Sequence, residues 1–155
     1  MAEVAWSPAA AVERTEALLA ELAIPWEELH CATKDVEEGN LLNLSHKLAR
    51  IANYAVRVNH VLTRLLARRT LLRETLEQAT DRRLAEPQTD GKRLAIDLRR
   101  AALIHETPAL RRMKIDLIET ASQVEVLTGA KDSLDLLWKT CSRIMSARQS
   151  EPLDR

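Results

Sequence analysis

The residues with the clearest chemical potential are the arginines between Gly39 and Glu74. Over the 34 residues from Asn40 to Arg73 there is no acidic side chain, but there are six arginines and one lysine. A guanidinium stays charged at every working pH, and its planar fork fits phosphate oxygens and can stack on bases. These properties are typical of contacts to a nucleic-acid backbone. We therefore assign five arginines as candidate contacts to single-stranded DNA: Arg57, Arg64, Arg68, Arg69 and Arg73.

The same charge pattern is also compatible with a protein that binds no DNA. Residues 1–39 carry a net charge of −7, residues 40–83 carry +6 and residues 84–155 carry +1, so the neutral total conceals a strong separation of charge. The acidic segment could pair with the basic one, within a chain or between neighbouring chains. The protein would then be a helical scaffolding or assembly protein. Alternatively, the acidic segment could mimic nucleic acid in a regulator that binds no DNA.

No other group of residues points to catalysis, a metal or a cofactor. Three glycines are too few for a glycine-rich phosphate loop. Glu27 and His30 form the one Glu-x-x-His pair in the sequence, whereas a di-metal site in a helical bundle needs two such pairs and two more carboxylates. We therefore expect a protein that is not an enzyme and that uses no cofactor or metal.

The cysteines and the hydropathy pattern bear on the compartment. Cys31 and Cys141 show no metal-ligand spacing, and we expect both to be reduced, buried side chains. The N-terminus lacks the basic-then-apolar order of a signal peptide. No apolar run approaches the length of about 18 residues that spans a membrane. These features predict a soluble, cytoplasmic protein with no membrane partner.

A long helix over residues 40–85 must position the arginines. Apolar side chains recur in alternating steps of three and four from Leu41 to Ala79, and only Arg69 interrupts the series. This heptad pattern predicts a helix that packs along another helix. No proline or glycine breaks it, and at about 1.5 Å per residue it would be roughly 65 Å long.

The acidic residues 1–39 are expected to form a separate N-terminal arm. Helix signals predict one helix over about 8–23, with Val12 facing inward, and a second over about 26–38. Pro25 separates them, because a proline disfavours helical backbone at the residue before it.

The remaining chain is expected to hold the C-terminal helices, over residues 86–149. The spacing of apolar residues predicts a helix over about 92–105 and a longer one over about 109–147, with a kink or break at Gly129. Residues 150–155 should be a frayed tail. Together these elements predict an all-α fold: a long-helix hairpin with a coiled-coil seam and a short acidic N-terminal helical arm.

An apolar row on the last helix predicts assembly. With the heptad seam, this row offers more apolar surface than one chain of long helices is expected to cover. We therefore predict a homo-oligomer held mainly by residues 109–148. The candidate oligomerisation residues are Leu134, Trp138, Cys141 and Met145.

The segment from Met113-Lys114 to Arg148, and above all the stretch from Leu134 to Met145, resembles the C-terminal segment of the UvsY family of phage recombination mediators. That family shares a Met-Lys start, a tryptophan near leucines, a cysteine several residues on and a basic residue at the helix end. Its long N-terminal helix is also rich in bases. The resemblance covers about residues 40–83 and 109–148.

The resemblance implies a homo-oligomeric mediator located in the host cytoplasm. Such a protein binds single-stranded DNA coated by a single-strand-binding protein and helps a RecA-like recombinase to assemble there. The C-terminal helix would be the oligomerisation element, and Arg68, Arg69 and Arg73 the DNA-contacting part. This chain departs from the family in having Leu71-Leu72 near the position of paired tyrosines, which puts base stacking in doubt. It also has an extra segment, 92–106, and a longer acidic N-terminus.

Overall fold

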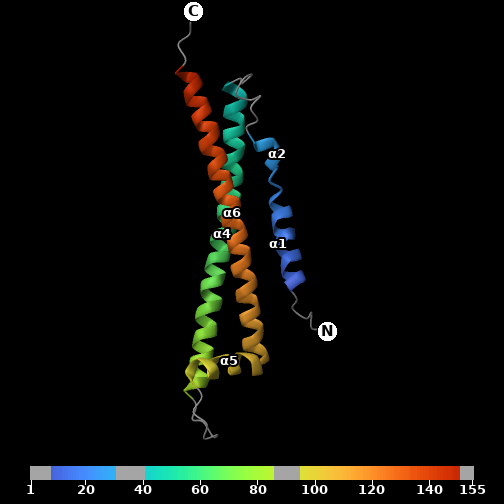
Figure 1. Ribbon diagram of the computed structural model, residues 1–155, viewed down its shortest axis with the longest axis vertical. Helices are drawn as coiled ribbons and strands as arrows, with labels where there is room; N and C mark the ends of the chain where they lie inside the picture. The colour runs from blue at the N-terminus through green and yellow to red at the C-terminus, as the bar shows by residue number, and fades with distance from the viewer. Residues whose placement is uncertain (1–7, 31–40, 86–94, 151–155) are drawn as a thin grey trace, which may run out of the picture.

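The computed structural model describes residues 8–30, 41–85 and 95–150. In these ranges the chain forms helices and no strand, so the all-α prediction is confirmed (Figure 1). The helices are α1 (Pro8–Leu22), α2 (Trp26–Leu29), α4 (Leu41–Leu84), α5 (Ile96–Glu106) and α6 (Pro108–Gln149).

Two long helices, α4 and α6, form the body of the molecule. They run in opposite directions along most of each other's length, and α5 lies across the lower end where α4 finishes and α6 begins (Figure 1). The predicted long-helix hairpin is therefore confirmed. The N-terminal helices α1 and α2 lie along one flank of this hairpin, as predicted for a short arm.

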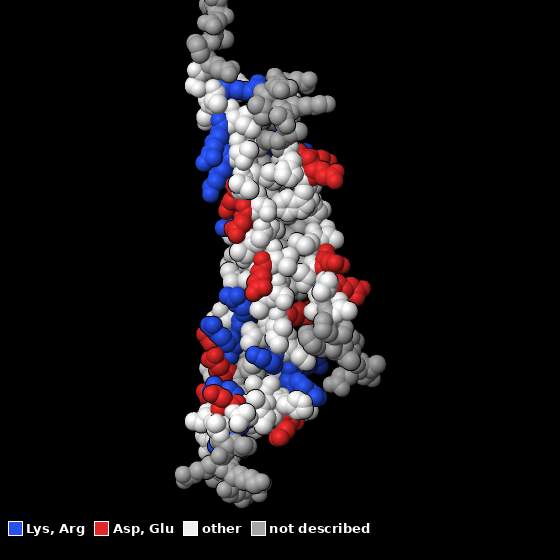
Figure 2. Space-filling model, in the orientation of Figure 1, with Lys and Arg blue, Asp and Glu red and all other residues white. Residues whose placement is uncertain are grey.

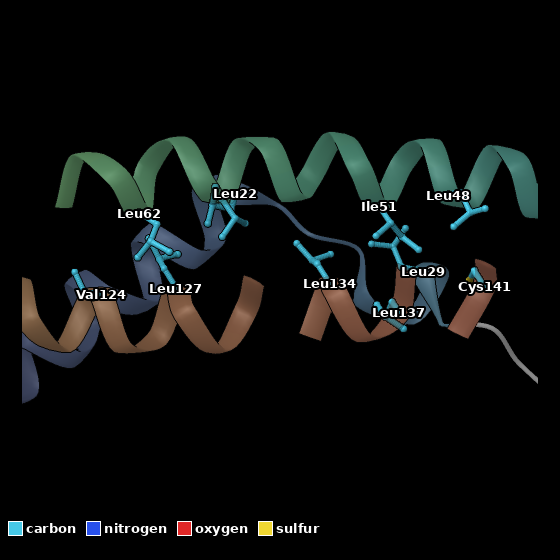
Figure 3. Close-up of a cluster of buried hydrophobic side chains, with 11 residues drawn as sticks. Leu22, Leu29, Leu48, Ile51, Leu62, Val124, Leu127, Leu134, Leu137 and Cys141 are labelled. Carbon is cyan, nitrogen blue, oxygen red and sulfur yellow. The ribbon is translucent and has the colours of Figure 1, made fainter. Parts of the chain in front are cut away.

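The heptad residues of α4 form its contact with α6. In the antiparallel register Leu62 faces Leu127, and Leu48 lies close to Cys141 (Figure 3). Burying each such side chain is worth roughly 1.5–3 kcal/mol, so this seam is the main source of stability. The fully buried large side chains in it include Leu44, Ile51, Val58, Leu127 and Leu134.

The seam shifts around α4 toward the end of the helix. Thr80 is buried there, while Ala79, which the heptad series predicted, is half-buried. A straight α-helix drifts about 20° per heptad against a strict seven-residue repeat, and this drift moves the contact by one residue. The Thr80 hydroxyl is satisfied, because it donates to the carbonyl oxygens of Leu76 and Glu77 at 2.9 and 2.8 Å.

Helix α6 runs through Gly129 without a break, so of the predicted kink or break the break is wrong and the kink stays a prediction. A glycine inside a helix costs about 1 kcal/mol relative to alanine. Leu127, Ala130 and Leu134 on either side of it are all buried in the core, and their burial outweighs that cost. The Ser133 hydroxyl also donates to the Gly129 carbonyl oxygen at 2.9 Å.

The N-terminal arm breaks between Leu22 and Trp26, which confirms the effect predicted for Pro25. Leu22 and Leu29 are buried in the hairpin core. Val12 is exposed, so the prediction that it faces inward is wrong. The α1 side chains that reach the core come from the last two turns of that helix, and Val12 precedes them. Residues 31–38 of the predicted second helix lie outside the described residues.

None of the side chains of helix α5 is fully buried, and arginine contacts help to hold this helix to the hairpin. Arg100 Nη2 lies 2.6 Å from the Asp81 carboxylate at the end of α4. Arg83 of α4 donates to the Thr107 hydroxyl at 2.8 Å, at the start of α6. The helix begins at Ile96, later than predicted, and residues 86–94 lie outside the described residues, as do residues 151–155 of the predicted tail.

Cys141 is fully buried in α6, as expected, but it is disulfide-bonded. The expectation of a reduced side chain is therefore wrong for Cys141, and Cys31 lies outside the described residues. Stable disulfides are commonest in oxidising compartments, and the bond at Cys141 therefore does not support the predicted cytoplasmic location. That location stays a prediction.

None of the described helices is both long and apolar enough to cross a membrane.

Candidate nucleic-acid interface

Three of the predicted arginines share one outer face of α4: Arg57, Arg64 and Arg68. At about 100° per residue, a step of seven residues returns to within about 20° of the starting direction, and so does a step of eleven. All three side chains are exposed. We call this set the arginine face.

The arginine face has no acidic partner in the part of the chain that the structure describes. The ion pairs there join other residues, and none of these three arginines takes part in an ion pair or a hydrogen bond with a described residue. Arg57 also lies over the ring of Tyr54, with its guanidinium carbon 5.6 Å from the ring centroid. Such a cation–π contact orients a guanidinium without using its N–H donors. The three guanidiniums are therefore available to an anionic ligand.

The other two predicted arginines lie elsewhere on α4. Arg69 is half-buried at a seam position, and the hairpin register places it level with the buried Thr120. Such a side chain packs its stem and extends its charge toward solvent. Arg73 is exposed but lies about 160° around the helix from Arg57. The structure therefore does not bring the five arginines together at one site.

The bases of α4 that precede the arginine face contact the acidic N-terminal arm. Arg50, seven residues before Arg57, places its Nη2 2.6 Å from the Glu28 carboxylate. This hydrogen bond raises the pKa of Arg50 above its ordinary value, and the charge of Glu28 acts in the same direction. The Lys47 ammonium donates to the His30 carbonyl oxygen at 3.1 Å. The arm therefore docks on the basic helix of its own chain.

A second ion pair fixes α1 to α6, and the sequence had no signal for it. Arg14 donates from Nε and Nη2 to the two carboxylate oxygens of Glu119, at 2.5 and 2.8 Å. The hydrogen bond to Glu119 raises the pKa of Arg14 above its ordinary value. Two-point contacts of this kind are more directional than single ones. The arm thus uses a base as well as an acid to hold its position.

The predicted oligomerisation residues differ in what they offer a second chain. Leu134 and Cys141 are fully buried within the hairpin, and Met145 packs half-buried against the same core. Trp138 is the one of the four with a large exposed surface, at 43%. Their role in oligomerisation stays a prediction, and Trp138 is the residue of this set that could carry it.

A shallow depression beside Trp138 was not expected from the sequence. It has a volume of about 350 Å³ and is lined by Trp138, Lys139, Ser142, Arg143 and Ser146. The spacing of these residues along one helix was a signal that could have revealed it, because residues four apart lie side by side. The described residues hold no group of three or more His, Cys, Asp or Glu side chains that could bind a metal.

In comparisons with known proteins, no family model, curated protein or solved structure matches this chain.

Proposed function

We propose that this protein binds single-stranded DNA through the arginine face of α4. The observation that supports the proposal is that Arg57, Arg64 and Arg68 are exposed in one row with no acidic partner among the described residues. Such a row suits the phosphates of a strand that passes along the helix, because each neutralised phosphate releases counterions.

A single strand fits this face better than a duplex. The row lies on the outer side of a long helix that packs against α6 along most of its length. Arginine can also stack on unpaired bases, which gives binding that tolerates any sequence. The protein is therefore proposed to bind without sequence preference.

The finer role is that of a recombination mediator. On the resemblance to the UvsY family, the protein would help a RecA-like recombinase to load onto DNA coated by single-strand-binding protein. A homo-oligomer would repeat the arginine face around its symmetry axis and extend the path of the strand. This step rests on the resemblance, and the exposed arginine face supports the part of it that concerns DNA.

The alternative is a helical scaffolding or regulatory protein that binds no DNA. A specific observation favours it: several large apolar side chains on the outer faces of the helices are exposed by 60% or more. A neighbouring chain could cover them in an assembly. They are Val56, Leu71, Ile96, Leu98 and Leu136. The ion pair between Glu28 and Arg50 also supports this alternative, because an acidic segment of the same chain occupies part of the basic helix.

The decisive experiment measures binding of a fluorescent oligothymidylate by anisotropy at several salt concentrations. The proposal expects the logarithm of affinity to fall with the logarithm of salt, by about 0.7 for each phosphate neutralised and so by about 2 for three arginines per chain. Light scattering with and without the oligonucleotide gives the assembly size. Absence of salt-dependent binding would reject the proposal in favour of scaffolding. Recombinase loading on protein-coated strand then tests the finer role.

A further inference from the structure

Trp138 is an unusual residue on α6, because it is large, aromatic and 43% exposed. It stands at the edge of the seam between two depressions. One is lined by apolar residues and Asp135, whose carboxylate lies 3.6 Å from the Lys131 ammonium. The other, of about 350 Å³, is the depression that the indole shares with two cations and two hydroxyl groups. We call it the Trp138 pocket.

The chemistry of the Trp138 pocket is that of a nucleotide subsite. Lys139 and Arg143 lie one helical turn apart, with Ser142 between them, and both cations are exposed. Among the described residues that line the pocket, none is acidic. Figure 2 shows basic side chains along the upper left edge of the molecule, over the C-terminal part of α6. A planar base can stack on an indole while neighbouring cations hold the phosphate, and this combination is typical of single-strand binding.

We propose that the Trp138 pocket binds single-stranded nucleic acid, with one base stacked on the indole and the adjacent phosphate held by Lys139 and Arg143. This inference rests on the proposed function, since it adds a second contact for the same class of ligand. The ligand class is a phosphate joined to an unpaired base, for which the pocket supplies both kinds of contact. Ser142 and Ser146 can donate hydrogen bonds to the same phosphate or to the sugar.

The pocket and the arginine face lie on different flanks of the hairpin. Ala52 and Ala55 border Trp138 on its α4 side, and both point about 140–160° around α4 from Arg57. A strand that touches both sites must therefore pass around the hairpin or run between two copies. Because the two sites share no residue, each can be removed without altering the other.

The test uses tryptophan fluorescence. Trp6→Phe and Trp26→Phe leave Trp138 as the one tryptophan of the chain, and oligothymidylate is then titrated while anisotropy follows binding. Stacking predicts that emission is quenched in step with binding. Trp138→Ala should weaken binding by roughly 5- to 150-fold, and Trp138→Phe should restore most of it, because phenylalanine also stacks.

Two matched controls accompany the test. Leu136→Ala removes an exposed apolar side chain from the same helix, and Lys114→Ala removes an exposed charge from it. Both should bind as the wild type does, whereas the double variant Lys139→Ala, Arg143→Ala should lower the magnitude of the salt slope by about 0.7, the value for one phosphate. Circular dichroism melting of every variant reports whether the fold is retained.

Three results would overturn the inference. In the first, the oligonucleotide binds without quenching the tryptophan emission, and Trp138→Ala binds it as tightly as the wild type. This result rejects the Trp138 pocket as a binding site but leaves the arginine face and the proposed function in place. In the second, tryptophan emission changes with the protein concentration and not with the oligonucleotide concentration, and Trp138→Ala has a smaller assembly mass than the wild type. This result assigns the surface to contact between copies of the chain. No binding by the wild type at any salt concentration rejects the pocket and the proposed function together.

Discussion

Two faces of α4 differ in charge, burial and partners. The face turned toward α6 carries Ile51 and Val58, which are fully buried in the core. The arginine face carries Arg57, Arg64 and Arg68, which are exposed and have no ion-pair partner among the described residues. Both faces repeat at nearly the same spacing, so the same helix presents a packed row and a charged row along its length.

The face turned toward α6 stabilises the fold, whereas the arginine face is left free by it. Long helices usually gain about 0.2–0.5 kcal/mol from each pair of opposite charges one turn apart, and the segment with the arginine face has no acid to provide such pairs. The seam supplies stability instead. Folding therefore does not require the arginines, which is the reason for assigning them to a ligand.

The largest effect is expected in the seam, from Leu134→Ala. Leu134 is fully buried between the two long helices, and truncating a buried leucine to alanine typically costs about 2–5 kcal/mol. Urea unfolding followed by circular dichroism measures the loss. Leu136→Ala is the matched control, since Leu136 is exposed on the same helix, and it should change stability by less than about 0.5 kcal/mol. Equal losses for the two variants would show that the hairpin does not pack as described.

Replacing the arginine face tests the opposite side of α4. In the triple variant Arg57→Ala, Arg64→Ala and Arg68→Ala, stability should stay nearly constant, because alanine is the best helix former. Affinity for oligothymidylate should fall, and the magnitude of the salt slope should drop by about 2. Anisotropy at two or more salt concentrations measures both.

The matched control for the arginine face removes the same charge from the lower end of the hairpin. Arg82, Arg111 and Arg112 are exposed and lie outside the arginine face. Their triple replacement by alanine should leave a stronger affinity than the arginine-face variant. If the two variants lose affinity equally, the effect is one of net charge, and the assignment of a specific face fails.

Gly129→Ala should stabilise the hairpin, by less than Leu134→Ala destabilises it. A Cβ atom added at Gly129 meets no atom within 4 Å, so the helix gains alanine's propensity, about 1 kcal/mol, without a clash. Thermal unfolding measures the gain. Ala67→Gly, at an exposed position of α4, should produce a loss of similar size. A destabilised Gly129→Ala would mean that α6 needs a bend at this residue.

The smallest effect is expected from Glu28→Gln, which tests whether the N-terminal arm keeps Arg50 from contacting DNA. The Glu28–Arg50 pair is exposed on both sides, so its loss should change stability very little. Arg50 would then be free to contact DNA, and the salt slope should grow by about 0.7. Glu27→Gln, on the neighbouring exposed acid, is the control. Weaker binding by Glu28→Gln alone would make the arm part of the site.

This point change is a sharper test than removal of the whole arm. The acidic character of the arm alone suggests deleting residues 1–38 to uncover the basic helix. The structure shows that Leu22 and Leu29 of the arm are buried in the hairpin core. The deletion would therefore expose apolar surface and change the fold along with the charge.

Local periodicity determined most of the fold. The heptad series between Leu41 and Ala79 is a property of neighbouring residues, and it predicted the length of α4 and its packing along a second helix. Pro25 marked a break for an equally local reason. The separation of Arg73 from Arg57 also follows from the helical period, so the division of the arginines could have been predicted from the sequence.

Tertiary structure decided the features that depend on register between distant segments. The continuity of α6 through Gly129 depends on burial against α4, which exceeds the local cost of a glycine. Contacts such as Arg14 with Glu119 and Glu28 with Arg50 join residues with no sequence signal for pairing. The same register buries Leu134 and leaves Trp138 exposed, although both belong to one apolar row. Whether a side chain becomes core or surface depends on what packs over it, and this is a property of the assembled hairpin.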